Sequence, residues 1–135
     1  MITVYIASPY TKGDVAVNVR NSFLMADKLV ELGYAPFPPL FSHFWHFLSP
    51  KSYEEWVRLD REWVLRCDCL LRLPGESEGA DAEVHLARMN RIPVFHRVED
   101  LVHDLPVRTS DETKRSVNPH LSVGKKGVGV QSSRR

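Results

Sequence analysis

Short apolar segments alternate with segments of helical periodicity along most of this sequence. Four strand-like runs, each bounded by proline, glycine or polar turn residues, cover residues 2–8, 34–37, 68–73 and 92–97. Helical patterns follow each run, apart from a short aromatic interruption, over residues 13–33, 52–67, 80–91 and 98–105. Parallel strands joined through helices bury both faces of their sheet. The alternation predicts a three-layer α/β/α sandwich, flavodoxin-like or Rossmann-like, with a parallel sheet of four to five strands.

The charge distribution divides the chain into a mildly acidic part and a basic end. Residues 1–105 carry a net charge of −4, whereas residues 106–135 carry +5 and few large apolar side chains. Such a segment cannot bury enough apolar surface to offset its ordering entropy. We therefore expect one domain over residues 1–105 and a flexible basic tail over 106–135. The positive charges of the tail are dispersed, so no nucleic-acid partner is predicted.

Composition excludes several classes of protein. With 43% hydrophobic and 26% charged residues, the chain is neither collagen-like nor wholly disordered. No apolar run approaches the ~20 residues of a membrane span, and the first residues lack the pattern of a signal peptide. We predict a cytoplasmic protein with no membrane partner. Cys67 and Cys69 are too few for a disulfide scaffold or a zinc site.

Three loop segments should meet at the carboxyl ends of the predicted strands, where ligands bind in such sheets. They are residues 8–13, the aromatic segment 40–50 and the glycine-containing segment 75–79. In the aromatic segment, His43 and Trp45 are expected to cover a flat ligand; packing in the core or against another subunit is the alternative. No Cys, His or carboxylate trio accompanies His43 and His46, so we predict no metal.

Two carboxylates are candidates for chemistry. Glu83 lies about one turn into the helix that follows the segment 75–79, and Asp60 lies on the helical face that bears the tryptophans. At one cleft, two carboxylates from two elements would support glycosidic-bond chemistry. The alternatives are a solvated helix face for Glu83 and an ion pair with Arg61, Arg66 or Arg72 for Asp60. Ser77 and Gly79 are candidate ligand contacts, because a hydroxyl and accessible backbone N–H groups suit a phosphate or sugar.

Three motifs, in order across residues 2–97, carry a family resemblance. They are VYIASPY, LDREWVLRCDCLLRL and SEGADAEVHLARMNRIPVF. Together they resemble the nucleoside 2-deoxyribosyltransferase superfamily, which includes the 2'-deoxynucleoside 5'-phosphate N-hydrolases. The resemblance implies a catalytic domain that cleaves the N-glycosidic bond of 2'-deoxynucleosides or their 5'-monophosphates. It also implies a homo-oligomer, a small-molecule deoxynucleoside or deoxynucleotide as partner, and neither a metal nor an organic cofactor.

The same resemblance implies roles for individual residues. Glu83 would attack C1' of the sugar, Asp60 would position the sugar and the nucleophile, and Tyr5 would hydrogen-bond to Glu83. Ser8 and Pro9 fall in the family's first ligand-binding loop, with Ser8 replacing the usual glycine. Ser77 falls where the phosphate-binding hydrolases carry serine, which favours a 5'-monophosphate, although the acidic Glu76 and Glu78 oppose one.

Transfer of the sugar to water or to another base therefore stays open. Two other functions also stay open. The chain could be a catalytically silent nucleotide-binding module, or a glycohydrolase of another ribosyl donor such as NAD.

Overall fold

The sheet of the computed structural model, which describes residues 1–108, has four parallel strands in the order β2-β1-β3-β4. The strands are β1 (Thr3–Ala7), β2 (Ala35–Phe37), β3 (Cys69–Arg72) and β4 (Val94–Phe95). This confirms the predicted α/β fold with a parallel sheet. β4 is shorter than predicted because it is an edge strand preceded by Pro93, which has no N–H to donate. The predicted tail lies outside the described residues from residue 109 onward.

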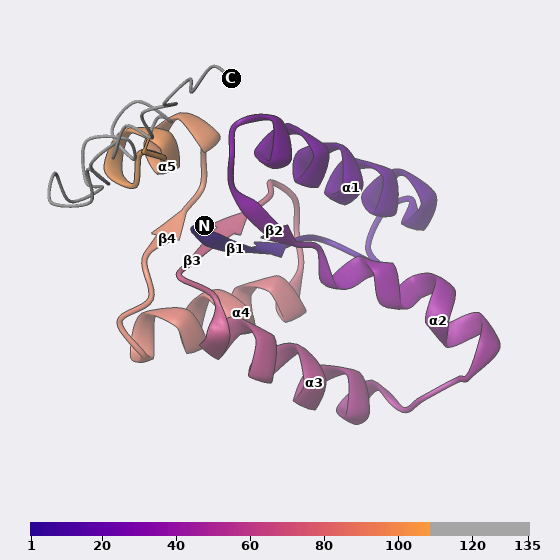
Figure 1. Cartoon of the computed structure of the whole chain (residues 1–135). Coiled ribbons are helices and arrows are strands. Elements are labelled where there is room, and N and C mark those ends of the chain that lie inside the picture. Colours follow the sequence, from indigo (N-terminus) through magenta and orange to yellow (C-terminus); the bar gives the residue numbers. More distant parts are fainter. Residues whose placement is uncertain (109–135) are drawn as a thin grey trace, which may run out of the picture.

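Helices cover both faces of the sheet, so the predicted three layers are confirmed (Figure 1). α1 (Val15–Glu31) and α5 (Val98–Asp104) pack on one face, and α3 (Tyr53–Arg66) and α4 (Glu78–Met89) pack on the other. The 3-10 turn η1 (Pro39–Phe41) and helix α2 (Ser42–Leu48) extend from the carboxyl end of β2. None of the helices within residues 1–108 is both long and apolar enough to cross a membrane.

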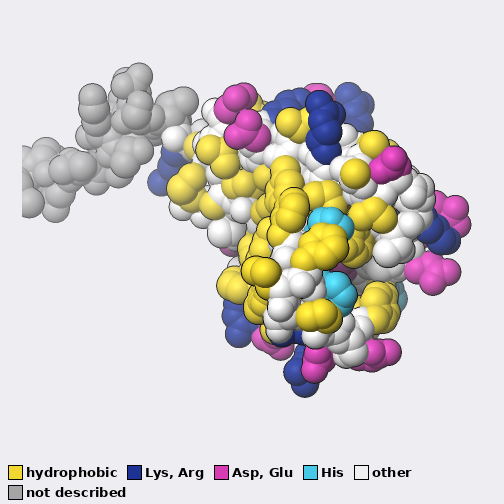
Figure 2. All heavy atoms as spheres, turned by 90° about the vertical axis from the view of Figure 1, so that its right-hand side faces the viewer, with side chains coloured by type: hydrophobic (Ala, Val, Ile, Leu, Met, Phe, Trp, Pro, Cys, Tyr) yellow, Lys and Arg dark blue, Asp and Glu magenta, His cyan; other side chains and the backbone are white. Residues whose placement is uncertain are grey.

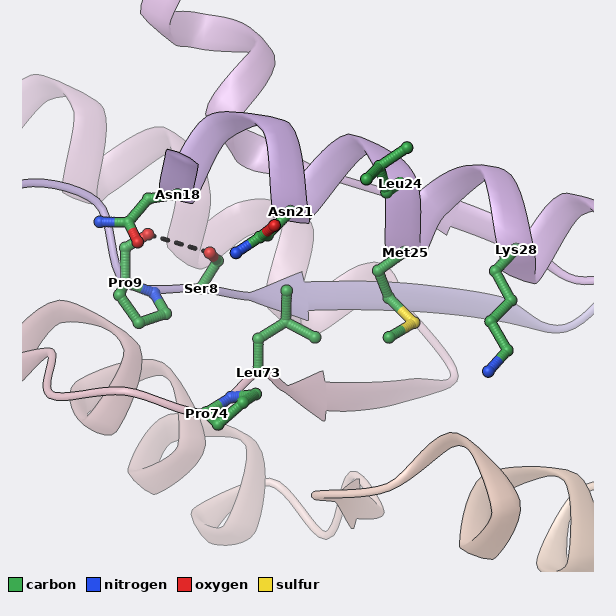
Figure 3. Close-up of a pocket in the computed structure, with 9 residues that line it drawn as sticks. All are labelled: Ser8, Pro9, Asn18, Asn21, Leu24, Met25, Lys28, Leu73 and Pro74. Atoms are coloured by element: carbon green, nitrogen blue, oxygen red, sulfur yellow. Dashed lines mark hydrogen bonds between the residues drawn. The ribbon is translucent and has the colours of Figure 1, made fainter. Parts of the chain in front are cut away.

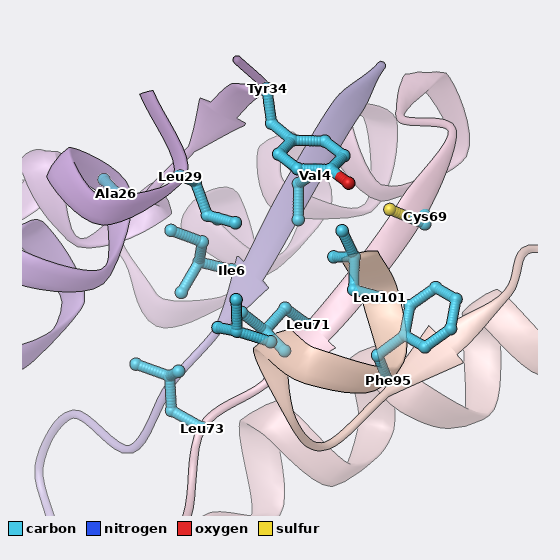
Figure 4. Packing of buried hydrophobic residues seen from close by; sticks show 11 residues of the cluster. Val4, Ile6, Ala26, Leu29, Tyr34, Cys69, Leu71, Leu73, Phe95 and Leu101 are labelled. Atoms are coloured by element: carbon cyan, nitrogen blue, oxygen red, sulfur yellow. The ribbon is translucent and has the colours of Figure 1, made fainter. Parts of the chain in front are cut away.

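The alternation of side chains along β1 assigns its residues to the two faces. Val4 and Ile6 belong to the core cluster under α1 and α5 (Figure 4), whereas Tyr5 and Ala7 belong to the cluster under α3 and α4. Buried alanine, leucine and valine side chains of α1 and α5 complete the first cluster, and buried alanine and valine side chains of α3 and α4 complete the second. Tyr5 is therefore held on the α3–α4 face with no exposed surface.

Two serines fix where α3 and α4 begin. Ser52 and Glu55 form the predicted capping box at α3. The hydroxyl oxygen of Ser77 accepts a hydrogen bond from the Ala80 N–H at 3.1 Å, so α4 begins at Glu78, two residues before the predicted start. This cap sets the rotational phase of α4 and thereby the direction in which Glu83 projects.

The aromatic segment 40–50 is helical, in η1 and α2, and buries none of the α2 side chains. Phe44, Phe47 and Leu48 are exposed. Figure 2, which faces this side of the molecule, shows hydrophobic side chains gathered around histidine rings. Formation of a homo-oligomer stays a prediction.

Candidate active site

A cleft of about 790 Å³ lies on the α3–α4 face of the sheet, at the carboxyl ends of the strands. The three segments expected to meet there all contribute to its lining, which confirms that prediction. Among the lining residues are Ser8, Leu40, His46, Asp60, Ser77 and Glu83. Both candidate carboxylates therefore belong to one cleft, with Asp60 supplied by α3 and Glu83 by α4.

Glu83 lies in the second turn of α4, and one of its carboxyl oxygens, Oε2, is buried without a hydrogen-bond partner among the described residues. The pKa of Glu83 is raised from 4.5 to about 8, mainly by burial and secondly by the negative charge of the nearby Asp60. The Tyr5 hydroxyl and the Arg72 guanidinium act in the opposite direction. A carboxylate in this environment is poorly solvated and therefore a reactive nucleophile once it is ionised.

Asp60 is the second carboxyl of the cleft. Burial raises its pKa from 3.8 to about 7. Within residues 1–108, Asp60 forms none of the ion pairs considered from the sequence, since Arg66 pairs with Glu62 and Arg72 pairs with Asp81. The negative charge of Asp60 in turn disfavours ionisation of the neighbouring Glu83.

Tyr5 lies beneath this pair on the central strand β1. Burial, followed by the negative charges of Glu83 and Asp60, raises the pKa of the Tyr5 hydroxyl well above its usual value. Tyr5 therefore stays protonated and acts as a donor toward Glu83. The two groups interact without the full geometry of a hydrogen bond, since neither Tyr5 Oη nor Glu83 Oε2 has a well-formed one within the described residues.

Sequence reasoning missed Arg72, the last residue of β3, as a site residue. Its side chain is 8% exposed. The guanidinium donates to the backbone carbonyl of Leu73, to that of Gly75 at 2.9 Å and to the Asp81 carboxylate at 2.9 Å. It thereby fastens the β3–α4 loop and places a positive charge near Glu83. An arginine inside an otherwise apolar strand, CLLRL, was the available signal.

The glycine-containing loop brings the first loop close. Gly75 has φ +116°, and a Cβ there would lie 2.8 Å from Pro9 Cγ, so only glycine fits. Pro9 packs against this glycine and is not among the residues that line the cleft, so its predicted contact with substrate stays a prediction. Ser8, Ser77 and Gly79 do line the cleft, and Lys12 of the first loop pairs with Glu76 at 2.9 Å.

His43 and Trp45 also lie outside the cleft lining. His43 is hydrogen-bonded to the Tyr10 hydroxyl at 2.7 Å, and Trp45 packs edge-on against Trp56 at 5.2 Å. Because α2 begins at Ser42, residues one turn apart share a face, and Ser42 and His46 line the cleft instead. Sequence reasoning could not assign this phase while the segment was read as a loop or a short helix.

A smaller hollow of about 350 Å³ lies on the other side of the first loop, between α1 and the ends of β1 and β3 (Figure 3). Pro9 contributes to this hollow, and Ser8 lines both cavities. The Ser8 hydroxyl donates to the Pro9 carbonyl at 2.9 Å. Within residues 1–108, no group of three or more His, Cys, Asp and Glu side chains is arranged to hold a metal ion.

A solved structure shares this fold. A 2-deoxyribosyltransferase from the psychrotolerant bacterium Bacillus psychrosaccharolyticus superimposes with a TM-score of 0.54 at 20% identity, covering 68% of this chain and 69% of that chain. The glutaminase domain of Trypanosoma brucei CTPS with bound acivicin reaches a TM-score of only 0.37 at 18% identity, covering 70% of this chain and 35% of that chain. The first of these establishes a common α/β fold.

At the level of sequence, no curated protein matches this chain significantly. One family model does match, and it spans residues 2–97, which include every strand, helices α1–α4 and both carboxylates of the cleft. The chain therefore belongs to the family described as Domain of unknown function (DUF7768).

Proposed function

We propose that this chain cleaves the N-glycosidic bond of 2'-deoxynucleosides or their 5'-monophosphates and transfers the 2-deoxyribosyl group to water or to another base. The observation that carries the proposal is the convergence of Glu83 and Asp60 at one cleft, with Tyr5 buried beside Glu83. The fold shared with a 2-deoxyribosyltransferase supports it. Each of these residues comes from a different element of the sheet or its cover, so their convergence is a property of the fold.

In the proposed reaction, an oxygen of the Glu83 carboxylate forms a bond to C1' while the bond from C1' to the base nitrogen breaks. The base leaves with that electron pair and takes up a proton from solvent. A water molecule or a second base then attacks C1' and releases a proton to solvent, the ester bond to Glu83 breaks, and the carboxylate is regenerated. Asp60 orients the sugar and the nucleophile, and the Tyr5 hydroxyl holds the carboxyl of Glu83.

The proposal is tested by a chromatographic assay of base release from each deoxynucleoside and each deoxynucleoside 5'-monophosphate, with and without a second base. Free base from monophosphates alone would identify a nucleotide hydrolase and support Ser77 as a phosphate contact. A new nucleoside formed only with the second base would identify a transferase. No base from any of these substrates would contradict the proposal; release from NAD or a ribonucleoside would then favour a different ribosyl donor.

Asp60→Asn is expected to lower kcat/KM about a hundredfold, because the sugar and the nucleophile lose their orienting group. Only ionised Glu83 can attack, so the wild-type rate should rise with pH through about 8. Asp60 raises the pKa of Glu83, and its neutralisation should therefore move this rise to lower pH. The pH profile of kcat/KM measures both effects, and an unchanged rate and profile would return Asp60 to a structural role.

A further inference from the structure

His46, on the α2 side of the cleft, has one ring nitrogen fully engaged by the protein. Its Nδ1 accepts a hydrogen bond from the indole Nε1–H of Trp56 at 3.0 Å and another from the backbone N–H of Lys51 at 3.2 Å. Both partners can only donate. Nδ1 is therefore unprotonated, and the ring proton of neutral His46 resides on Nε2. His46 lines the cleft, and Nε2 has no hydrogen-bond partner among the described residues.

The surroundings hold this ring in place. The Trp56 indole packs edge-on against Trp45, and the Lys51 ammonium lies 5.4 Å from the Trp45 ring and 5.8 Å from the Trp56 ring, within cation–π range. The capping box at Ser52 fixes the chain between Lys51 and Trp56. Several contacts thus hold the His46 ring in an orientation in which Nδ1 is the acceptor.

The residues on this side of the cleft carry hydrogen-bond donors. Lys51 and Trp56 line the cleft together with His46. An ammonium and a neutral imidazole with a protonated Nε2 both donate hydrogen bonds, whereas Asp60, one turn after Trp56 on α3, and Glu83 of α4 bring carboxyls to the same cleft. A flat heterocycle stacked on the Trp56 indole would direct its attached sugar toward the carboxyls of Asp60 and Glu83. The edge of the base remote from the sugar would then lie near the donors of His46 and Lys51.

We propose that His46 is a specificity-determining residue that donates its Nε2–H to an oxo group of the nucleobase. This inference rests on the proposed function and specifies its substrates. Bases with a 4-oxo or 6-oxo group should bind. In the corresponding amino bases, the exocyclic NH2 group would face the Nε2–H of His46, and both donors would lack an acceptor. The expected discrimination is at least about tenfold in affinity and in kcat/KM.

The protonation of His46 can be measured without any turnover. Long-range proton–nitrogen NMR of the full-length, nitrogen-15-labelled chain should show His46 with a protonated Nε2 and an unprotonated Nδ1. The His46→Gln variant identifies the signals by their loss. Trp56→Phe removes one of the two donors and leaves the Lys51 N–H, so it should raise the population of the other tautomer above that in the wild-type chain. A protonated Nδ1 in the wild-type chain would overturn the inference whether or not the chain is an enzyme.

Discrimination between bases is measured by calorimetric titration of the non-reacting Glu83→Gln chain. The probes are two pairs, the 5'-monophosphates of deoxyuridine and deoxycytidine and those of deoxyinosine and deoxyadenosine. The oxo member of at least one pair should bind at least about tenfold more tightly. Adding His46→Gln, whose amide can donate or accept, should reduce this ratio below about threefold. Adding His96→Gln, at an exposed position outside the cleft, should leave it unchanged.

Each result has a separate meaning. An unaltered ratio in the His46→Gln background, or no preference for oxo bases, would overturn the role of His46 while leaving the proposed function intact. If none of the four nucleotides binds and the wild-type chain releases no base, the proposed function fails and the assignment of His46 to base recognition fails with it. Oxo-selective binding that His46→Gln abolishes would support both.

Discussion

Glu83→Gln is expected to abolish base release and, at the same time, to make the folded chain more stable above pH 8. Loss of the nucleophile should reduce kcat by at least about a thousandfold, since an amide cannot form the glycosyl ester. The gain in stability arises because glutamine has nearly the same shape and carries no charge. It removes the need to ionise a buried carboxyl that burial and Asp60 both disfavour.

The pH dependence of this gain follows from the raised pKa of Glu83, 4.5 in its ordinary state and about 8 in the fold. The folded chain favours the protonated form of Glu83. The contribution of this carboxyl to the free energy of unfolding is therefore complete below pH 4.5 and is lost as pH rises through 8. The variant does not suffer this loss. Its advantage in free energy of unfolding should be near zero at pH 4 and reach on the order of a few kcal/mol at pH 9.

Urea unfolding of both chains between pH 4 and 9, without ligand, measures this difference. Glu31→Gln, which neutralises an exposed carboxylate at the end of α1, should change the free energy of unfolding by less than about 0.5 kcal/mol at every pH. Glu83→Ala should also stay folded and release no base. Near-normal turnover in either Glu83 variant would remove the nucleophile assignment, and a difference that does not grow with pH would contradict the buried environment of this carboxyl.

Local patterns were sufficient to predict the layers of the fold. The continuous apolar run of β1 and the capping box of α3 depend on a few neighbouring residues, so both could be predicted from the sequence. The topology of a parallel sheet then brings the loops after β1 and β3 together. That is why Ser8 and Ser77 could be expected at one cleft from the sequence, whereas the convergence of Asp60 and Glu83 was implied by the family resemblance.

The rotational phase of a short helix and the contacts between distant segments could not be predicted from the sequence. His43 and His46 are three positions apart, and only the start of α2 at Ser42 decides which of them faces the cleft. Pro9 follows β1, and its packing against Gly75, sixty-six positions away, could not be predicted from the sequence. Such contacts depend on how two loops meet, and no periodicity in either segment encodes that meeting.

Arg72→Met is expected to destabilise the chain by about 2–4 kcal/mol and to move the pH profile opposite to Asp60→Asn. The guanidinium donates to the carbonyls of Leu73 and Gly75 within a nearly closed site, and methionine would leave these acceptors without that donor. The positive charge also lowers the pKa of Glu83. Its loss should raise that pKa, so ionised Glu83, and with it any activity, would appear only at higher pH.

Two variants separate the contributions of Arg72. Asp81→Asn removes only the 72%-exposed partner of the ion pair and should cost less than about 1 kcal/mol, since solvent screens that pair. Arg72→Lys keeps the charge but cannot reach two carbonyls and a carboxylate as a guanidinium does, so it should lose stability while shifting the pKa of Glu83 less than Arg72→Met. Carbon-13 NMR of the Glu83 carboxyl follows that pKa without requiring turnover. If Asp81→Asn destabilised the chain as much as Arg72→Met, the exposed ion pair, and not the buried carbonyl contacts, would be what fastens the β3–α4 loop beneath the cleft.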